Sequence, residues 1–512
     1  MRKEEKGITL VALIITIVVM LILVAVSLNV LVNSNLIGHA EKTGDKYKMA
    51  YEDESKMSKV TINGKEYASL EDYTKEKLWD GETTELPELR KNETTGKFDW
   101  YIYNVQQLKF LANFVNQTLT AADEQLILDK NTTKEEIEIT TDTTIYLMAD
   151  INLGATFDEN GKLTSGKEWI PIGLTKNQRL YGIFEGNNHY ISGVYVNREE
   201  EFNGIFGNCN TVKNLTVKNS YIEGRGCTGG IAGAVRGGTV ENCHNENTVV
   251  VLKEGGNYTV GGVIGQSEAS KINNCTNRGK VLVNGKKSSN SQSNSGGIVG
   301  IVGGSTSEVL NCINYGDVIA TKESGFFIGG ICGGMGTTQT TFKNCENYGN
   351  IQGVAFVGGI VGLLSSTSTV EECRNFGDIT CFKECAGGIT GQNTQKNGES
   401  TSKVSKCYNS GTISGPKELG GIVAWFCGET KQGTVEKCYN KGAINATDGE
   451  SGAIIGKQTK YEGNAVFNNL YYLNTIGLFA INNQEKYNTE TVKAVEDDLE
   501  TYEEFIEWIN SK

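Results

Sequence analysis

The thirteen cysteines of this chain are the residues with the widest range of possible chemistry, because a thiol can bind metal, form a disulfide or act as a nucleophile. A structural zinc site usually shows two closely spaced pairs of Cys or His ligands. Only Cys381 and Cys385 form a C-x3-C pair, and neither a second pair nor a nearby histidine completes a site. The sequence therefore predicts no metal and no cofactor.

Acid–base catalysis would need histidines or carboxylates that the fold brings together. The three histidines, His39, His189 and His244, are far apart, and none belongs to the H-E-x-x-H motif of zinc proteases. Carboxylates clustered in a groove would suit a polysaccharide lyase or hydrolase. The candidates for that alternative are Asp317, Asp378, Glu371 and Glu372.

The glycine-rich blocks could bind phosphate, as nucleotide-binding loops do. The block "GGIVGIVGG" at Gly296 has neither a G-x-G-x-x-G fingerprint leading into a helix nor the Gly-Lys-Ser/Thr ending of a P-loop. Related blocks instead recur at steps of 29 to 35 residues and end in a degenerate copy at Ser451. The first glycines of the well-formed copies are Gly229, Gly261, Gly296, Gly329, Gly358, Gly387 and Gly420.

A second block follows in phase with the first and reads hydrophobic-x-x-Cys-x-Asn-x-Gly. Its cysteines are Cys243, Cys275, Cys312, Cys345, Cys373, Cys407 and Cys438, and its asparagines are Asn245, Asn277, Asn314, Asn347, Asn375, Asn409 and Asn440. The remaining cysteines, Cys209, Cys227, Cys332, Cys381, Cys385 and Cys427, lie outside the block.

Each repeat holds short β-prone runs between Gly and Asn corners, with no helical period, so it cannot bury its apolar face alone. Stacked turns can, with strands paired in parallel about 4.8 Å apart. The repeat therefore predicts a mainly β fold, a parallel β-solenoid, in which Ile298 and Val299 supply core and near-core positions. The cysteines are expected to form a column of buried free thiols, because parallel side chains hold Cβ atoms too far apart for disulfides. The asparagines are expected to mark turns and to hydrogen-bond along the axis.

The same periodicity weighs against catalysis. Asp317 and Asp378 both follow the turn glycine of the repeat. Residues of other types stand at the equivalent positions, namely Lys280, Asn350, Thr412 and Ala443. Such variation is typical of a solvated surface. We therefore predict no catalytic residues and no enzyme, with a β-helix polysaccharide lyase or hydrolase as the alternative.

The combination of "GGIVG" with "VxNCxNxG" resembles the GLUG repeat of bacterial surface proteins, which occurs in adhesins and beside immunoglobulin A1 protease-type zinc proteases. The lead-in "YIYNVQQLKFLANFVNQ" (101–117), "IYLMADINL" (145–153) and "WIPIG" (169–173) is similar to the same family. The resemblance covers about residues 98–475 and implies adhesion or surface display.

The N-terminus carries an apolar run, residues 8–32, with no ionisable side chain. At 1.5 Å per residue this run is roughly 37 Å long, enough to cross a bilayer core as one transmembrane helix. The junction "KGITLVALIITIVVMLI" resembles the cleavage and methylation segment of type IV prepilins. That resemblance implies cleavage between Gly7 and Ile8 and pilin-like subunits as partners. Ala12 stands where the family has glutamate, which puts assembly into a major pilus shaft in doubt.

The chain thus divides into a leader (1–7), a transmembrane helix (8–32), a stalk or linker (33–95), an N-terminal cap helix with a lead-in strand (96–155), the solenoid (156–470) and a C-terminal cap (471–512). Both caps are expected to be short helices, because apolar residues recur at helical spacing from Val105 and in "TYEEFIEWIN". The formal net charge of −13, without a basic stripe, argues against a nucleic-acid partner.

We expect a membrane-anchored, extracellular adhesin or display protein, with a minor pilin-like subunit and a purely structural surface or fibre component as further readings. The partner would be a host protein or a glycan. The ligand-binding residues cannot be identified from the repeat, because the repeated positions build the solenoid. The longest variable loops, 284–295 and 392–402, are the expected contact surfaces.

Overall fold

The computed structural model describes residues 60–62, 65–67, 79–253, 259–284, 293–336, 339–365, 367–394, 402–427, 433–458, 466–482 and 492–511. The chain divides into two units, Met1–Leu78 and Trp79–Lys512. In the first unit, β1 (Val60–Ile62) pairs antiparallel with β2 (Lys65–Tyr67). The predicted leader, the Gly7–Ile8 cleavage site and the apolar run 8–32 lie outside the described residues. None of the helices in the described part has the length and apolar character needed to span a membrane.

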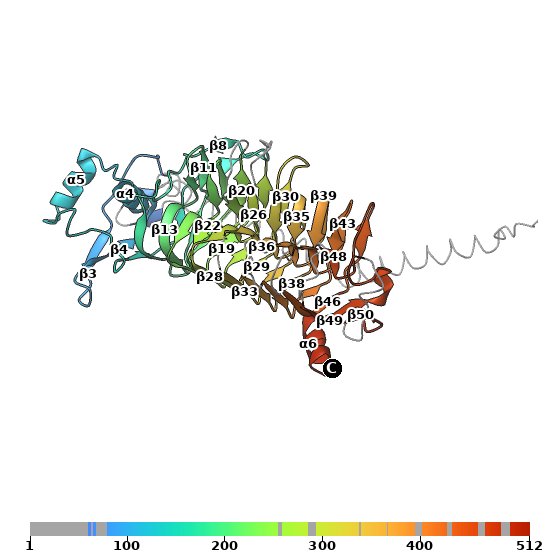
Figure 1. Cartoon of the computed structure of the whole chain (residues 1–512). Coiled ribbons are helices and arrows are strands. Elements are labelled where there is room, and N and C mark those ends of the chain that lie inside the picture. Colours follow the sequence, from blue (N-terminus) through green and yellow to red (C-terminus); the bar gives the residue numbers. More distant parts are fainter. Residues whose placement is uncertain are drawn as a thin grey trace, which may run out of the picture. The chain divides into compact units, whose positions relative to one another are not determined.

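The second unit is a parallel β-solenoid of about eight turns, as the repeat predicts. The turns stack in one row, and equivalent strands of successive turns lie side by side (Figure 1). The turn that contains Gly296 is representative. Its strands are β26 (Asn294–Gly296), β27 (Val299–Gly303), β28 (Thr306–Leu310), β29 (Ile313–Asn314) and β30 (Val318–Ala320).

The larger sheet has 31 strands and contains the rows of β27, β28 and β29. The row of β27 comprises β13 (Phe206–Lys213), β17 (Ala232–Arg236), β22 (Ile264–Glu268), β32 (Cys332–Met335), β36 (Val361–Ser365), β40 (Thr390–Thr394), β45 (Val423–Phe426) and β48 (Ile455–Gln458). The row of β28 comprises β9 (Leu180–Glu185), β18 (Thr239–Glu241), β23 (Lys271–Asn273), β33 (Gln339–Lys343), β37 (Thr369–Glu371), β41 (Lys403–Ser405), β46 (Thr434–Asn440) and β49 (Val466–Leu473). The row of β29 comprises β10 (Tyr190–Ser192), β14 (Thr216–Lys218), β19 (His244–Glu246), β24 (Thr276–Asn277), β34 (Glu346–Asn347), β38 (Arg374–Asn375) and β42 (Tyr408–Asn409).

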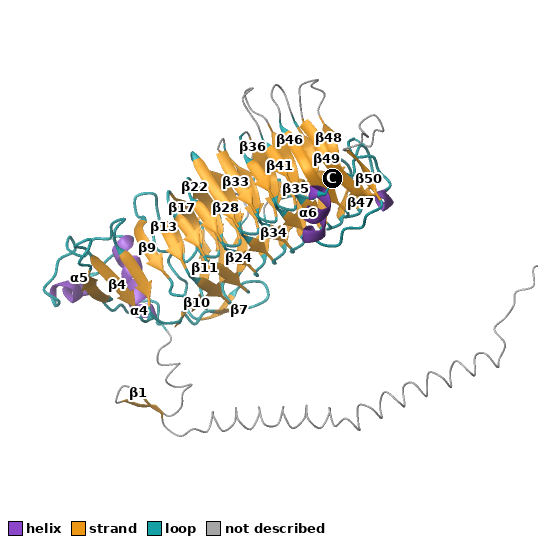
Figure 2. Ribbon diagram, turned by 90° about the horizontal axis from the view of Figure 1, so that it is seen from below, coloured by secondary structure: helices purple, strands orange, loops and turns teal. Residues whose placement is uncertain are grey.

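The smaller sheet has 15 strands and contains the rows of β30 and β26. Its strands besides these two are β11 (Tyr195–Arg198), β12 (Phe202–Asn203), β15 (Tyr221–Gly224), β16 (Cys227–Gly229), β20 (Val249–Leu252), β21 (Thr259–Gly261), β25 (Val281–Val283), β31 (Phe327–Gly329), β35 (Ile351–Gly358), β39 (Ile379–Gly387), β43 (Ile413–Gly415), β44 (Leu419–Gly420) and β47 (Ile444–Ala446). Figure 2 shows how little helix or loop covers the outer face of the strands.

The interior is filled by the repeat's apolar residues. Ile298 and Val299 are both fully buried, and their equivalents line one continuous core from the first turns to the last. A second cluster, which includes Val318 and Ile351, lies against the smaller sheet. Turns stay in register because every strand pairs with the same position of the next turn, as Val309 does with Phe342. The core is therefore built by the repeat and not by any single turn.

Asparagines carry the left-handed backbone at one corner. The residue just before each column cysteine has a positive φ, and these residues are Asn242 (51°), Asn274 (53°), Asn311 (53°), Asn344 (54°), Glu372 (56°), Lys406 (53°) and Lys437 (52°), with Asn214 (52°) in the preceding turn. We call this set the left-handed column. Asn adopts this conformation at lower cost than other non-glycine residues. The glycine pairs of the repeat have no positive φ, and they are needed for the close approach of neighbouring turns.

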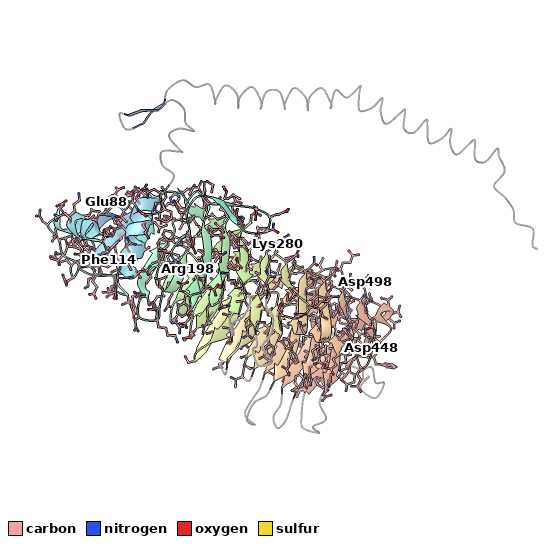
Figure 3. The ribbon with its side chains drawn as sticks, turned by 90° about the horizontal axis from the view of Figure 1, so that it is seen from above. Glu88, Phe114, Arg198, Lys280, Asp448 and Asp498 are labelled. Atoms are coloured by element: carbon pink, nitrogen blue, oxygen red, sulfur yellow. The ribbon has the colours of Figure 1, made fainter. Side chains whose placement is uncertain are left out.

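The N-terminal end begins earlier than the sequence suggests. Residues 79–95 were expected in the linker, but Trp79 is buried and packs edge-on against Trp169, and β3 (Glu88–Lys91) pairs antiparallel with β4 (Phe98–Ile102). Helix α4 (Val105–Val115) lies where the spacing predicts it, and Figure 3 marks its residue Phe114 at this end of the solenoid. The other elements here are α5 (Ala121–Leu128), β5 (Thr144–Leu147), β6 (Ile151–Asn152), β7 (Thr156–Phe157) and β8 (Leu163–Ser165).

The C-terminal helix does not close the end of the solenoid as expected. After β49 come a 3-10 turn, η1 (Asn474–Ile476), then β50 (Val492–Val495), which continues the larger sheet, and α6 (Tyr502–Asn510). Helix α6 lies on the side of the stack, because Tyr408 donates hydrogen bonds to the carbonyls of Leu499 and Glu500 just before it. Its apolar face meets tyrosines that point outward from the strands, so it covers a lateral surface.

Candidate functional site

The repeated cysteines lie inside the solenoid. All seven are buried, and their thiols donate to main-chain carbonyls, as Cys312 does to Leu310 at 3.2 Å. Burial raises the pKa of Cys243, Cys312, Cys373 and Cys407 well above the usual thiol range. These four thiols are poor nucleophiles, because the thiolate is the reactive form. Burial also acts to raise the pKa of Cys345, but hydrogen bonds from Cys312 and Cys373 lower it; its side chain is nonetheless fully buried and closed to a reactant from solvent. The column therefore contributes packing.

The other cysteines are also mostly buried. Burial raises the pKa of Cys227 and Cys381 to about 11 and that of Cys209 to about 12. Cys385 donates to the Glu418 carboxylate at 2.9 Å, and Lys457 pairs with the same carboxylate. Within the described residues, no group of three or more His, Cys, Asp or Glu side chains is arranged to hold a metal ion.

The repeated asparagines form a continuous hydrogen-bonded amide ladder, and all are fully buried. In the first six of them, Asn245, Asn277, Asn314, Asn347, Asn375 and Asn409, the Nδ2 donates to the Oδ1 of the asparagine in the next turn at 2.7–2.9 Å, and Asn440 is the last acceptor. The same Nδ2 atoms also donate to main-chain carbonyls, as Asn347 does to Gly349 at 2.8 Å. Buried amides satisfied on both sides stabilise one register of the stack.

The glycine pairs make room for this ladder. In six of the seven copies, from Gly262 to Gly421, a Cβ on the second glycine of the pair would lie 2.2–2.5 Å from the amide carbon of the ladder asparagine, and at Gly230 it would lie 2.3 Å from the Gly262 carbonyl oxygen. A Cβ on the first glycine would lie 2.0–2.2 Å from a carbonyl oxygen three residues later, in all seven copies from Gly229 and Gly261 to Gly420. Only glycine therefore fits either position.

The carboxylates considered for catalysis have partners in the solenoid. Asp317 accepts from the main-chain N–H of Asn350 at 2.9 Å, and Asp378 accepts from that of Thr412 at 2.8 Å. These side chains cap the backbone of the following turn on the exposed row that begins with Lys280, labelled in Figure 3. Glu371 and Glu372 form ion pairs with lysines of neighbouring turns. Asp317 and Asp378 thus lie at one corner of the solenoid, and Glu371 and Glu372 lie at another, so the four carboxylates do not form one cluster.

The histidines are equally separate. His189 contacts Asp150 at 3.0 Å near the N-terminal end, and His244 contacts Thr276 at 2.8 Å. Burial lowers the pKa of His244 below its ordinary value. His39 lies outside the described residues.

A column of aromatic side chains on the outer face is the feature that sequence reasoning missed. Tyr315 and Tyr348 stack with ring centroids 5.2 Å apart, and Tyr348 stacks on Phe376 at 4.7 Å. The guanidinium of Arg278 lies 4.0 Å from the ring centre of Tyr315. We call Arg278, Tyr315, Tyr348 and Phe376 the aromatic column. Tyr315 is 38% exposed and Tyr348 43% exposed.

The signal for this column was present in the sequence. All four residues occupy the variable position of Asn-x-Gly in the repeat, in four consecutive copies. Because strands pair in register, residues of one repeat position stand about 4.8 Å apart, close to the stacking distance of aromatic rings. Arg and Tyr are the residue types that dominate binding energy at protein interfaces. The column therefore has the composition of a recognition surface.

The same face continues under the C-terminal helix. Phe376 contacts Tyr408, and Tyr408 contacts Tyr439, at ring centroids 6.0 and 5.9 Å apart. Tyr439 donates to the carbonyl of Asp497 at 2.8 Å, and Phe505 of α6 packs on both tyrosines. Here the outer aromatic residues already bind a peptide segment, namely the chain's own C-terminus.

The variable loops predicted as contact surfaces lie largely outside the described part. Residues 285–292 and 395–401 are not described, although Asn294, Ser295 and Gln392 at their edges belong to β26 and β40. The structure therefore supplies the aromatic column as a candidate surface and leaves the loops as a prediction.

Comparison with known proteins finds the GLUG motif at residues 256–282. The comparison with curated proteins finds no match. Among solved structures, the chain is similar to the crystal structure of a "putative immunoglobulin A1 protease from Bacteroides ovatus", with 16% identity over 74% of this chain and 85% of that chain, at a TM-score of 0.35. A TM-score this low carries no argument about activity. The motif and the β-solenoid together fit a surface or structural protein.

Proposed function

We propose that this β-solenoid with a GLUG motif is a cell-surface adhesin or display protein that recognises a host protein or a glycan. The observation that carries the proposal is the exposed aromatic column. Inside the solenoid, the amide ladder and the apolar core already fix the register, so the fold does not require Tyr315 and Tyr348 on the outside. A row of exposed aromatic rings stacked on one another beside an arginine is expected where a partner binds.

The test is adhesion by cells that display the full chain. We expect binding to at least one member of a panel of glycans and matrix proteins, and about a tenfold loss in the Tyr315→Ser/Tyr348→Ser double variant. Tyr181→Ser is the matched control, because Tyr181 is also 43% exposed but lies outside the column. Antibody staining of surface levels normalises the comparison.

Two outcomes would overturn the proposal. Equal adhesion by the double variant and the wild type would show that the aromatic column does not take part in recognition. The variable loops, 284–295 and 392–402, would then be the remaining candidate contact surfaces. Release of soluble sugar from a polysaccharide panel would favour the lyase or hydrolase instead.

The proposal places the chain at the outer side of the membrane, anchored by residues 8–32, with pilin-like processing between Gly7 and Ile8. Arg2, Lys3 and Lys6 precede the apolar run and favour a cytoplasmic N-terminus. Mass spectrometry of the mature protein from its own host should find methylated Ile8 as the first residue. An intact Met1 would rule out processing and leave a simple membrane anchor.

A further inference from the structure

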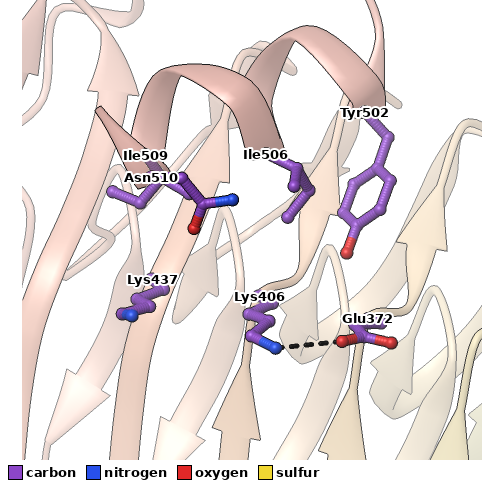
Figure 4. A pocket seen from close by; sticks show the side chains of 7 residues that line it. All are labelled: Glu372, Lys406, Lys437, Tyr502, Ile506, Ile509 and Asn510. Carbon is purple, nitrogen blue, oxygen red and sulfur yellow. Dashed lines mark hydrogen bonds and ion pairs between the residues drawn. The ribbon is translucent and has the colours of Figure 1, made fainter. Parts of the chain in front are cut away.

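A small pocket lies between α6 and the side of the solenoid. It has a volume of about 190 Å³ and is lined by Glu372, Lys406, Lys437, Tyr502, Ile506, Ile509 and Asn510. Figure 4 shows the helix residues pointing down toward the charged side chains of three successive turns. Pockets for drug-sized ligands are usually 300–1,000 Å³, so this one suits a single sugar or an amino acid.

The floor of the pocket is made by an interruption of the left-handed column. In five preceding turns the column holds asparagine, and Asn344 donates to Asn311 at 2.8 Å, as Asn242 does to Asn214. In the three turns beneath α6 it holds Glu372, Lys406 and Lys437 at φ values of 52–56°. A residue other than Asn or Gly pays about 1 kcal/mol for this conformation. Charged side chains are thus placed here although asparagine would fit the backbone better.

Tyr502 supplies a hydroxyl without a partner. It is only 7% exposed, and its Oη is buried with no hydrogen-bond partner among the described residues. The guanidinium of Arg374 lies 4.0 Å from the ring centre and holds the ring in place. Burial raises the pKa of Tyr502, so the hydroxyl stays protonated and can donate. A buried donor without an acceptor costs free energy that a ligand would recover.

The charges of the lining leave one cation unmatched. Glu372 pairs with Lys406 at 3.0 Å and with Lys343 at 3.4 Å. Lys437 has no carboxylate partner among the described residues. The Asn510 amide adds a further donor, while Ile506 and Ile509 form an apolar wall. Two donors and an unmatched ammonium favour an acceptor of negative charge.

We propose that this pocket binds a small monocarboxylate, with the carboxylate held by Lys437 and the Asn510 amide and an apolar part of the ligand against Ile506 and Ile509. The Tyr502 hydroxyl lies at the other end of the pocket, beside Glu372 (Figure 4), and donates to a neutral acceptor of the ligand. The carboxylate belongs either to a sugar acid or to an acylated amino acid, which share this chemistry. The ligand bridges α6 to three turns of the solenoid. This site shares no residue with the aromatic column, so a negative result at the pocket would not count against the proposed adhesion, and the reverse also holds.

The test is a titration of the full chain in detergent with D-glucuronate and with N-acetyl-leucine, followed by ligand-observed NMR. Glucose and N-acetyl-leucine amide are the neutral probes. We expect one carboxylate to bind and its neutral counterpart to bind at least about tenfold more weakly. The probe that binds identifies the source of the carboxylate.

Variants locate the binding. Lys437→Asn restores the asparagine of the column, so it should fold, and it should weaken binding about tenfold. Tyr502→Phe removes one hydroxyl and should weaken binding severalfold. Lys271→Asn is the control, because Lys271 is exposed and pairs with Glu308 away from the pocket. The proposal is overturned if neither carboxylate binds, if the neutral probes bind equally, or if Lys437→Asn binds like the wild type.

Discussion

In and beside strand β34, Cys345 and Asn347 point into the solenoid, whereas Glu346 and Tyr348 point outward. The inward positions keep one residue type through seven successive turns, while the outward ones change at nearly every turn. Inside, each side chain must match its copy above and below, since the amide ladder and the close glycine contacts allow no alternative. Outside, a side chain need only tolerate its neighbours. Function is therefore expected on the outer face, and stability on the inner one.

The largest effect should come from a methyl group on the inner side. In Gly330→Ala, the new Cβ would lie 2.2 Å from the Gly359 carbonyl oxygen and 2.4 Å from the Asn347 side chain. Both atoms are fixed by the stack, so we expect a loss of about 3–5 kcal/mol or local unfolding. Gly303→Ala is the matched control, because its nearest atoms are 3.9 Å away. Thermal melting followed by circular dichroism measures the stability of both variants. Similar melting temperatures for Gly330→Ala and Gly303→Ala would contradict the expected difference between the inner and outer faces.

Removing one rung of the amide ladder should come next. Asn347→Ala leaves the Asn314 amide donor and the Asn375 acceptor without their partner in a fully buried site. We expect a loss of about 2–4 kcal/mol in denaturant unfolding. Asn445→Ala on the outer face, where the side chain makes one exposed hydrogen bond at 3.3 Å, should change stability by less than about 0.5 kcal/mol. Equal losses would show that the ladder is dispensable.

The aromatic column should matter far less for folding than for binding. Tyr348→Ser removes two stacked ring contacts on an exposed surface, so we expect a loss of about 1 kcal/mol or less. A larger loss in the same unfolding assay would make the column structural, and it would weaken the proposed role in recognition.

Restoring the column asparagine in the pocket should raise stability slightly. Lys437→Asn relieves an unfavourable φ of 52° and removes no described ion pair, so we expect a gain of up to about 1 kcal/mol. A gain in stability together with a loss of carboxylate binding would show that the lysine is retained for its charge. A decrease in the melting temperature would indicate a structural role instead.

The smallest effect concerns pH. Burial acts to raise the pKa of Glu372, but hydrogen bonds and charge from Lys406 and Lys343 outweigh it, and the pKa lies below the ordinary value. A carboxylate with a depressed folded pKa stabilises the protein above its unfolded pKa, and this contribution is lost as the pH falls through the folded pKa. Glu372→Gln should therefore flatten the decline of the melting temperature on the acid side of pH 5. An unchanged decline would contradict this assignment.

Much of the fold could be predicted because every copy of the repeat shows the same pattern of buried and turn-forming residues. Seven copies of Cys-x-Asn, six of which continue as x-Gly, mark a parallel solenoid, and helix α4 follows from its apolar spacing. The position of α6 could not be predicted in this way. Its apolar face is equally suited to an open end and to the tyrosines of a lateral surface, and the choice depends on Tyr408 and Tyr439 standing side by side.

The candidate site was hidden for a similar reason. Tyr315 and Tyr348 are 33 residues apart in the chain and look like ordinary variable positions. Only the register of the stack brings their rings within 5.2 Å. The pocket depends on the register of the stack and also on where the final helix packs, because Lys437 lies in the solenoid and Tyr502 in that helix.

The sequence alone determined that this chain stacks short turns, that the same inward residues recur in each turn, and that glycine and asparagine lie at the corners. Those features are local and periodic, so each copy repeats the information. The tertiary structure decided why the glycines are required, where the C-terminal helix lies, and which outward residues meet. These outcomes depend on contacts between residues of different turns, whose distances are set only when the whole stack has formed.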